Sequence, residues 1–343
     1  RLVRSPNSRS RKDQGGNTVA KPTAAIPRVV AREKKMETRE AAPLPFGKLG
    51  ALIGSLRPHQ WVKNTLVFGG LIFSRSLSHS SALRLSIVAF VLFCIAASGV
   101  YLLNDLRDLR EDRIHPIKSR RSLAAGLISP MTALLLGLAL LVGSVTASVI
   151  ISPAFAGVLG VYLVMNISYS LGLKRVVIVD VMIIAFGFVL RAVAGAAVIG
   201  VKASSWLILC TLMLALMVGF GKRRHELTFL RAEAQNHRAS LESYSLPFLD
   251  LMMAICGGAA VVTYSLYTMA EDTVARVGSS GLVLTVPYVV YGIFRYLFLI
   301  HLRKDGGDPS RLFVADKPIL LNVVLWVTTV CLILYGPTAW LPF

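Results

Sequence analysis

The chain has 343 residues, of which 55% are hydrophobic and only 16% are charged. Its mean hydropathy of +0.64 excludes an ordinary soluble domain and indicates a polytopic membrane protein. The formal net charge is +19. We attribute this excess to the Lys/Arg bias of membrane topology, and we predict no nucleic-acid partner.

The chain begins with a basic segment rich in Arg, Lys, Ser, Ala and Pro, without apolar periodicity. We predict that residues 1–47 are a disordered tail on the cytoplasmic side. Such a tail helps to set orientation and is weakly attracted to anionic lipid headgroups. Residues 48–60 are then expected to form a short interfacial helix, and 48–343 a single transmembrane domain.

Nine apolar segments follow, and we judge each by the need for roughly twenty residues to cross the hydrocarbon layer. The first is short and needs its interfacial start to reach that length. We therefore predict an all-α fold with nine transmembrane helices. The expected spans are 61–74, 82–104, 131–152, 155–172, 180–200, 204–221, 246–270, 280–302 and 319–340.

The positions of the basic residues predict which side of the membrane each loop occupies. When the nine spans alternate, 31 of the 37 Lys/Arg fall on one side, together with the tail. Four fall on the other side, and two lie within spans. Because Lys and Arg concentrate in cytoplasmic loops, the tail and the four charged loops are expected in the cytoplasm and the C-terminus outside.

An acidic cluster stands at the cytoplasmic end of the second span. Asn104, Asp105, Asp108 and Asp112 are spaced i, i+1, i+4 and i+8, so they are expected on one face of a helix end. A solvated stop-transfer loop is the simpler interpretation, but it needs only Lys and Arg. Acidic groups at membrane depth are usually functional. We predict that Asn104, Asp108 and Asp112 bind Mg²⁺, which prefers oxygen ligands and shares them with phosphates.

A second set of polar residues surrounds the fifth span. Tyr169 and Lys174 lie in the preceding loop and suit phosphate or hydroxyl recognition, although Tyr is also common at membrane interfaces. Asp180 and Arg191 are eleven residues apart and are expected to face the same way. They are either part of the site or a structural ion pair.

Two further segments carry candidate phosphate ligands. Lys63 and Asn64 stand at the head of the first span. The loop after the sixth span reads Gly-Lys-Arg-Arg-His-Glu-Leu over 221–227 and supplies the candidates Lys222, Arg223, Arg224 and Glu226. Lys and Arg bind phosphate by charge-assisted hydrogen bonds, whereas the alternative is simple topological anchoring.

The acidic motif at the end of the second of nine spans resembles that of the UbiA-type intramembrane prenyltransferase superfamily. The resemblance covers roughly residues 50–340. It implies that 48–343 is a catalytic domain, a UbiA-like bundle with a cytoplasm-facing active site, and that the first motif holds Mg²⁺ on a diphosphate. The chain lacks the second aspartate-rich motif that normally follows the sixth span, because 221–227 is basic there.

Four motifs together resemble one branch of that superfamily, the decaprenyl-phosphate 5-phosphoribosyltransferases. They are RPHQWVKN, NDxxDxxxDRxHPxKxxR, YSxxLKRxxxxD and GKRRHEL. The resemblance implies a pentosyltransferase that uses phosphoribosyl diphosphate and polyprenyl phosphate to make a lipid-linked precursor of cell-wall arabinan. Asp105, Asp108 and Asp112 would be catalytic. The second motif adds Arg113, Lys118 and Arg121 to the substrate-binding candidates.

Two other functions stay open at this point. A UbiA-type enzyme that moves a prenyl chain from a prenyl diphosphate to an aromatic acceptor would normally have the second aspartate motif. A transporter would show broken helices and inverted repeats near the membrane midplane, whereas here the polar residues collect at one face. The expected location is the plasma (inner) membrane, with membrane lipids as partners. A homo-oligomer is possible, although no motif requires one.

Overall fold

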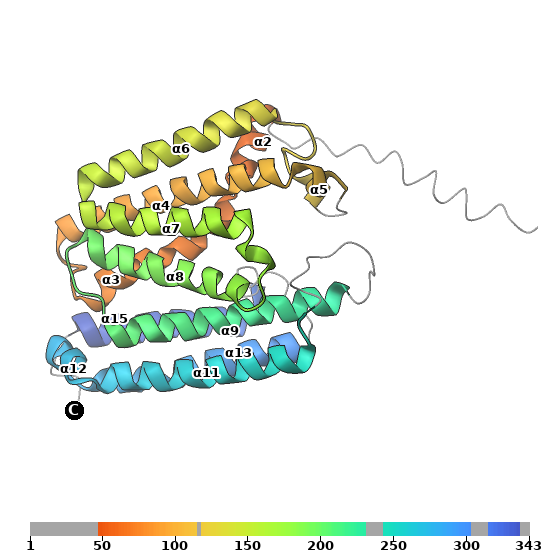
Figure 1. Ribbon diagram of the computed structural model, residues 1–343. Helices are drawn as coiled ribbons and strands as arrows, with labels where there is room; N and C mark the ends of the chain where they lie inside the picture. The colour runs from red at the N-terminus through yellow and green to blue at the C-terminus, as the bar shows by residue number, and fades with distance from the viewer. Residues whose placement is uncertain (1–46, 115–117, 231–242, 303–314, 337–343) are drawn as a thin grey trace, which may run out of the picture. The chain divides into compact units, whose positions relative to one another are not determined.

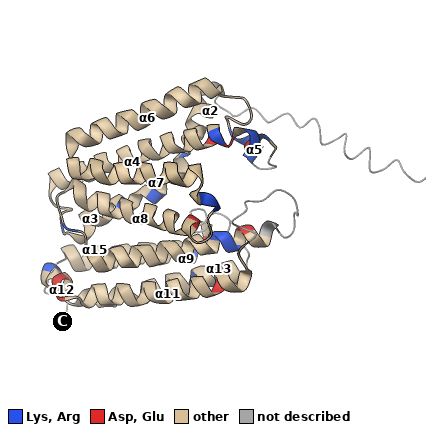
Figure 2. Ribbon diagram, in the orientation of Figure 1, with Lys and Arg blue, Asp and Glu red and all other residues tan. Residues whose placement is uncertain are grey.

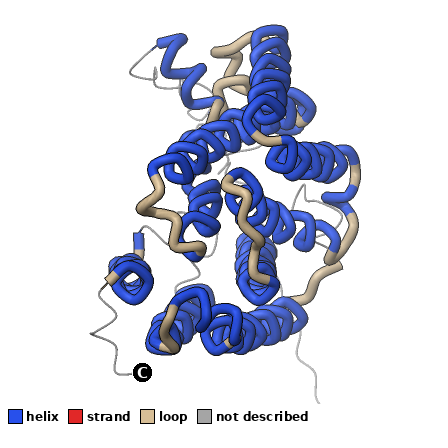
Figure 3. The backbone as a smooth tube through the Cα atoms, turned by 90° about the vertical axis from the view of Figure 1, so that its left-hand side faces the viewer, coloured by secondary structure: helices blue, strands red, loops and turns tan. Residues whose placement is uncertain are grey.

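The computed structural model describes residues 47–114, 118–230, 243–302 and 315–336. These residues are almost wholly helical and include no strand (Figures 1 and 3). Of the disordered tail expected over 1–47, residues 1–46 lie outside the described residues, and Gly47 is the first residue of α2 instead. Parts of the loops that follow the second, sixth and eighth expected spans also lie outside the described residues.

Most of the described residues lie in α- and 3₁₀-helices. In chain order they are α2 (Gly47–Ser55), η1 (Pro58–Val67), α3 (Phe68–Phe73), α4 (Ser80–Arg107), α5 (Leu109–Ile114), η2 (Lys118–Arg120), α6 (Pro130–Ile151), α7 (Pro153–Leu171), η3 (Leu173–Arg175), α8 (Val179–Val198), α9 (Ser205–Leu230), α11 (Leu246–Met269), α12 (Glu271–Val277), η4 (Gly281–Thr285), α13 (Val286–Leu302) and α15 (Lys317–Tyr335).

Eight of the nine expected spans are helices long and apolar enough to cross a membrane, so this is a multi-pass membrane protein. The segment expected over 61–74 differs, because it is divided into the 3₁₀-helix η1 and the short helix α3. Ten residues at about 2.0 Å and six at about 1.5 Å still extend roughly 29 Å, about the thickness of the hydrocarbon layer. The expected interfacial helix is α2.

Successive long helices run in alternate directions, so the bundle has two distinct ends (Figure 1). We call the end that contains α5, η2, η3 and the last turns of α9 the charged end, and the end that contains α3, α12 and the first turn of α9 the opposite end. The segment η1–α3 also runs from the charged end to the opposite end (Figure 1).

Helices α4 and α8 form the centre of the bundle. Within their most apolar windows 61% and 56% of the residues are buried, against 17–33% in the other spans. One hydrophobic core joins them to η1 and α7 around Phe93 and Phe155, and a second joins α9, α11 and α13 around Met253 and Tyr296. Polar residues on α4 and α8 are therefore held on the two most buried membrane-spanning helices that the structure describes.

Two glycines allow the η1–α3 segment to lie directly against α8. A Cβ atom built on Gly195 would stand 1.8 Å from the carbonyl oxygen of Val67, and one built on Gly70 would stand 2.7 Å from the amide of Ala196. The atoms they would meet belong to the backbone and cannot rotate away. This close approach places η1 between the two central helices.

We expect Gly195→Ala to destabilise the protein by about 1–3 kcal/mol, because the added methyl must push η1 away from α8. Gly143→Ala is the matched control, since a Cβ there meets nothing within 4 Å and alanine favours a helix. Thermal unfolding in detergent at one fixed scan rate compares the two variants. Equal midpoints for both would contradict the close contact.

Candidate active site

Lys, Arg, Asp and Glu gather at the charged end (Figure 2). The acidic segment after α4 is helical but bends at Asp108. α4 ends at Arg107, Asp108 adopts φ −87° and ψ 10°, and α5 follows. The Asp108 amide still donates to the carbonyl of Asn104 at 2.9 Å, and the Asp112 amide to the carbonyl of Asp108 at 2.8 Å. The predicted i, i+4 spacing therefore continues through the bend.

Asp105 and Asp112 share one guanidinium group. Arg121 Nη1 donates to Asp105 Oδ1 at 3.1 Å and to Asp112 Oδ2 at 2.6 Å. Arg57 also pairs with Asp105, and the Lys118 ammonium lies 3.9 Å from Asp112. The two carboxylates are only 7% and 3% exposed, so they need these cations to offset the cost of desolvation.

Asn104 and Asp108 face the end of α7 and η3 instead. Ser170 Oγ donates to Asn104 Oδ1 at 2.5 Å. Lys174 Nζ donates to the two carboxylate oxygens of Asp108 at 3.0 and 3.3 Å. On a helix the four positions span an arc of about 100°, which is one face as expected, but their side chains divide into two pairs with different partners.

Asp180 pairs with Arg223, so the alternative of an Asp180–Arg191 ion pair is wrong. Arg223 Nε donates to Asp180 Oδ2 at 2.7 Å, and the two side chains are 2% and 0% exposed. Arg223 Nη1 donates to Glu226 Oε2 at 2.5 Å, and Nη2 to the Tyr169 hydroxyl at 3.3 Å. Four residues that the sequence proposed separately therefore form one network.

Tyr244, just before α11, completes this network. Its hydroxyl donates to Asp180 Oδ1 at 2.8 Å and accepts from the Ile178 amide at 2.6 Å. Ile178 has φ +69°, a strained value for a β-branched residue. Burial, with the neighbouring Asp180 carboxylate, raises the pKa of the Tyr244 phenol. The hydroxyl therefore stays protonated at neutral pH and continues to donate.

The last turn of α7 joins the two groups of charges. Tyr169 bonds to Arg223 on α9, while its neighbour Ser170 bonds to Asn104 on α4. Residues from α4, α7, η3, α8 and α9 are consequently brought together at the charged end.

Arg191 lies about 16 Å deeper along α8 than Asp180, at about 1.5 Å per residue. Arg191 Nε donates to Asn64 Oδ1 at 2.7 Å, and Nη2 donates to the Tyr162 hydroxyl at 3.0 Å. Arg191 and Asn64 are 6% and 1% exposed. Lys63 bonds to a glutamine within η1. The structure does not bring these three candidates to the charged network, and their role in substrate binding stays a prediction.

The basic segment 221–226 is helical rather than a loop, because α9 continues well past the expected end of the sixth span. Successive residues on a helix differ in direction by about 100°. Arg223 points inward, whereas Arg224 Nε donates to Asp250 of α11 at 2.5 Å on another side of α9. Lys222 is half-buried and bonds to no described residue. The three cations are therefore not one cluster.

Residues 65–316 match the UbiA prenyltransferase family, and this match covers most of the chain. The chain belongs to the UbiA prenyltransferase family. Over 313 residues it is 31% identical to the decaprenyl-phosphate phosphoribosyltransferase of Mycolicibacterium smegmatis, covering 87% of this chain and 97% of that protein. It is also 31% identical over 297 residues to the enzyme of the same name from Corynebacterium glutamicum, covering 85% and 89%.

Solved structures agree with this UbiA assignment. A UbiA homolog from Archaeoglobus fulgidus bound to GPP and Mg²⁺ superimposes with a TM-score of 0.63 at 18% identity, over 83% of this chain and 99% of that chain. The same homolog bound to Cd²⁺ gives 0.57 at 17% identity. At these identities the likeness shows the fold.

The donor atoms of this UbiA chain suit a hard divalent cation, although they are not assembled as a metal site. Asn104, Asp108 and Asp112 offer only oxygen ligands, and Mg²⁺ commonly takes one or two carboxylates and completes its shell with water and phosphate. Within the described ranges no three His, Cys, Asp or Glu side chains are grouped for metal binding. Lys174 and Arg121 are bonded to the carboxylates instead.

Sequence reasoning missed three residues of this network: Arg57, Ser170 and Tyr244. Arg57 and Ser170 stand inside the RPHQWVKN and YSxxLKR motifs, so both motifs contained the signal. Tyr244 has no spacing relation to Asp180 that a sequence would reveal. Arg113, which was predicted to bind substrate, is exposed and bonds to none of the residues that the structure describes.

We expect Asp180→Ala to destabilise the protein by about 3 kcal/mol, because it leaves the buried Arg223 guanidinium short of one carboxylate. Asp108→Ala should cost less than about 1 kcal/mol, since the Asp108 and Lys174 side chains are 29% and 16% exposed and the ammonium can reach water. Unfolding midpoints in detergent measure both changes. A larger loss of stability in Asp108→Ala than in Asp180→Ala would contradict the assignment of Asp180 to a buried ion pair and of Asp108 to a partly exposed one.

Proposed function

We propose that this chain transfers the 5-phosphoribosyl group of phosphoribosyl diphosphate to a polyprenyl phosphate such as decaprenyl phosphate, releasing diphosphate. The observation that carries the proposal is a single carboxylate cluster bonded to cations from separate segments. Those cations are Arg57, Lys118, Arg121 and Lys174. The names of the relatives that match over nearly their whole length support the same reaction.

The charges of the substrates explain why cations outnumber carboxylates here. Phosphoribosyl diphosphate carries a diphosphate at C1 and a phosphate at C5, and the acceptor adds a third phosphorylated group. Lys and Arg bind each of these groups by charge-assisted hydrogen bonds. Where a prenyltransferase would use a second acidic motif, this chain has Lys222 and Arg223 on the last turns of α9.

Asp108 and Asp112, with the Asn104 side-chain carbonyl, would hold Mg²⁺, which when bound supplies positive charge to the leaving diphosphate. For this, Lys174 and Arg121 must release their carboxylates. Both side chains then have free N–H donors beside the place where the diphosphate lies. We propose that this exchange of partners couples metal and donor binding.

The remaining network is suited to orient the ribose. Tyr169 and Glu226 both bond to Arg223, which Asp180 holds in place. The Glu226 carboxylate, 28% exposed, is available to accept hydrogen bonds from ribose hydroxyls. Asp180, fully buried, acts by positioning Arg223.

The acceptor phosphate is already an anion, so the reaction needs no strong general base. One of its oxygens forms a bond to C1 as the bond from C1 to the diphosphate oxygen breaks, and the diphosphate leaves with the electron pair. Positive charge develops on the ribose in this oxocarbenium-like transition state, while negative charge develops on the leaving group. Lys174, Arg121 and Arg57 stabilise the latter.

The orientation follows from the charge bias. The charged end would face the cytoplasm, where soluble phosphorylated donors occur, and the last described helix would end on the outer side of the plasma membrane. Transfer of a prenyl group to an aromatic acceptor is the second candidate. This second candidate is favoured by the UbiA homolog from Archaeoglobus fulgidus, which was solved with GPP and with DMAPP. The basic end of α9, where a second acidic motif would be expected, argues against it.

The purified protein, incubated with Mg²⁺, polyprenyl phosphate and labelled phosphoribosyl diphosphate, should transfer label to lipid. Asp108→Ala and Asp112→Ala should each lower the rate at least about 100-fold while the protein stays folded, because a preorganised charge at the leaving group is lost. Asp272→Ala on α12, an exposed acid at the opposite end, is the control with unchanged rate.

Two results would contradict the proposal. One is turnover of a prenyl diphosphate with an aromatic acceptor and no transfer from phosphoribosyl diphosphate. The other is full activity in both aspartate variants, which would remove the carboxylates from the site.

A further inference from the structure

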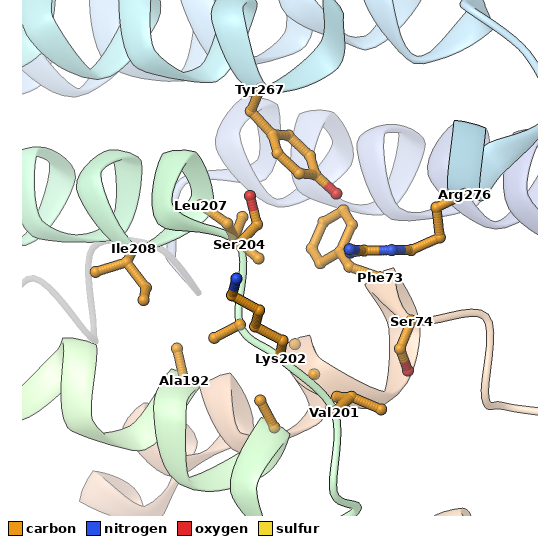
Figure 4. A pocket seen from close by; sticks show the side chains of 14 residues that line it. Phe73, Ser74, Ala192, Val201, Lys202, Ser204, Leu207, Ile208, Tyr267 and Arg276 are labelled. Atoms are coloured by element: carbon orange, nitrogen blue, oxygen red, sulfur yellow. The ribbon is translucent and has the colours of Figure 1, made fainter. Parts of the chain in front are cut away.

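The opposite end holds a small cavity of about 30 Å³ that opens to the surroundings. It lies between α3, the C-terminal part of α8, the α8–α9 connection and the ends of α11 and α12 (Figure 4). The helices that separate it from the charged end are about 20 residues long, or about 30 Å. It is therefore distinct from the proposed reaction site.

Two cations line this cavity. Lys202 comes from the α8–α9 connection and Arg276 from α12. In Figure 4 the Lys202 ammonium points toward Ser204, and the Arg276 guanidinium lies beside Phe73. Neither forms a hydrogen bond or ion pair with any residue in the described part of the chain, and the lining contains no Asp or Glu. The predicted topology places only four Lys/Arg on the side of the membrane opposite the tail. Two of these four, Lys202 and Arg276, line this one cavity.

Tyr267 supplies an independent sign of a ligand. The residue is 1% exposed, and its ring packs edge-on against Phe73 with centroids 5.7 Å apart. Its hydroxyl points into the cavity near the Arg276 guanidinium (Figure 4). No described residue is hydrogen-bonded to that hydroxyl, which is accessible from the cavity although the residue as a whole is buried. A ligand atom that accepts hydrogen bonds would complete it.

The rest of the lining is apolar or small. Phe73, Leu207 and Ile208 surround the polar groups, and Ser204 adds one more hydroxyl (Figure 4). A ligand that suits this site has two parts: an anionic group with several acceptor oxygens, and a hydrocarbon part attached to it. Basic pockets between membrane helices bind the headgroups of anionic lipids in this way.

We infer that this cavity binds the phosphodiester of an anionic glycerophospholipid from the leaflet at the opposite end. Lys202, Arg276 and the Tyr267 hydroxyl hold the phosphate oxygens, and the acyl chains lie against the apolar wall. Such a lipid bridges the α8–α9 connection and α12, which belong to different halves of the bundle. Bound lipid then stabilises the fold by mass action.

The test uses the full chain in a neutral, phosphate-free detergent, titrated with short-chain phosphatidylglycerol or with phosphatidylcholine of the same chain length. Phosphatidylglycerol should raise the unfolding midpoint, and native mass spectrometry should detect it bound. The double variant Lys202→Ala/Arg276→Ala should weaken this binding about 25-fold, or about fivefold for each cation. Tyr267→Phe should weaken it as well.

Arg84→Ala is the matched control, because Arg84 is an exposed cation at the start of α4 that does not line the cavity. It should leave lipid binding unchanged. If the double variant does not fold, Lys202→Gln alone tests the same contact and should weaken binding about fivefold. Phosphoribosyl transfer is measured in parallel, so that failure of this site is distinguished from failure of the proposed reaction.

Three outcomes would overturn the inference. Equal shifts with the two phospholipids would show that the headgroup charge is not recognised. Undiminished binding in the Lys202 and Arg276 variants would show that another surface binds the lipid. If millimolar inorganic phosphate, or polyprenyl phosphate in preference to phosphatidylglycerol, produced the effect through these residues, the glycerophospholipid assignment would be wrong.

Discussion

Pairing of buried carboxylates with cations is the constraint on which the charged end depends. An unpaired carboxylate at the membrane boundary is costly, so each aspartate there bonds to a cation from a different segment. Arg57 precedes η1, Lys174 belongs to η3, and Arg223 belongs to α9. These bonds fix the connections between helices, and they gather residues as far apart in the sequence as Arg57 and Arg223 into one site.

The same pairs give the site its proposed chemistry. A cation that stabilises an aspartate in the folded protein is also the group that a phosphate attracts. In the proposed mechanism, metal bound to the carboxylates would displace the cations, and bound diphosphate would supply those cations with new partners. The ion pairs thus already hold the N–H donors of these cations in position beside the acidic motif. Asp180 and Arg223 differ, because both are almost inaccessible and remain bonded to each other.

The sequence predicted those features that depend on composition along the chain. Hydropathy located eight spans, and the acidic motif was placed correctly at the end of α4. The predictions that were wrong concerned which residues, distant in sequence, contact one another in the folded protein. Asp180 and Arg191 share a helix side, yet Asp180 pairs with Arg223, 43 residues away, because α9 continues past the expected end of the sixth span. The close contact between Val67 at the end of η1 and Gly195 of α8 is likewise one that no periodicity reveals.

The central claim is that carboxylates and cations exchange partners when metal and diphosphate bind together. Calorimetric titration of diphosphate into the purified protein, with Mg²⁺ fixed in the millimolar range or removed by chelation, tests it most directly. The account predicts at least about fivefold tighter binding with Mg²⁺, a typical coupling between linked sites, and loss of that difference in Asp108→Ala. Equal diphosphate affinity with and without Mg²⁺ in the unmodified protein would contradict it.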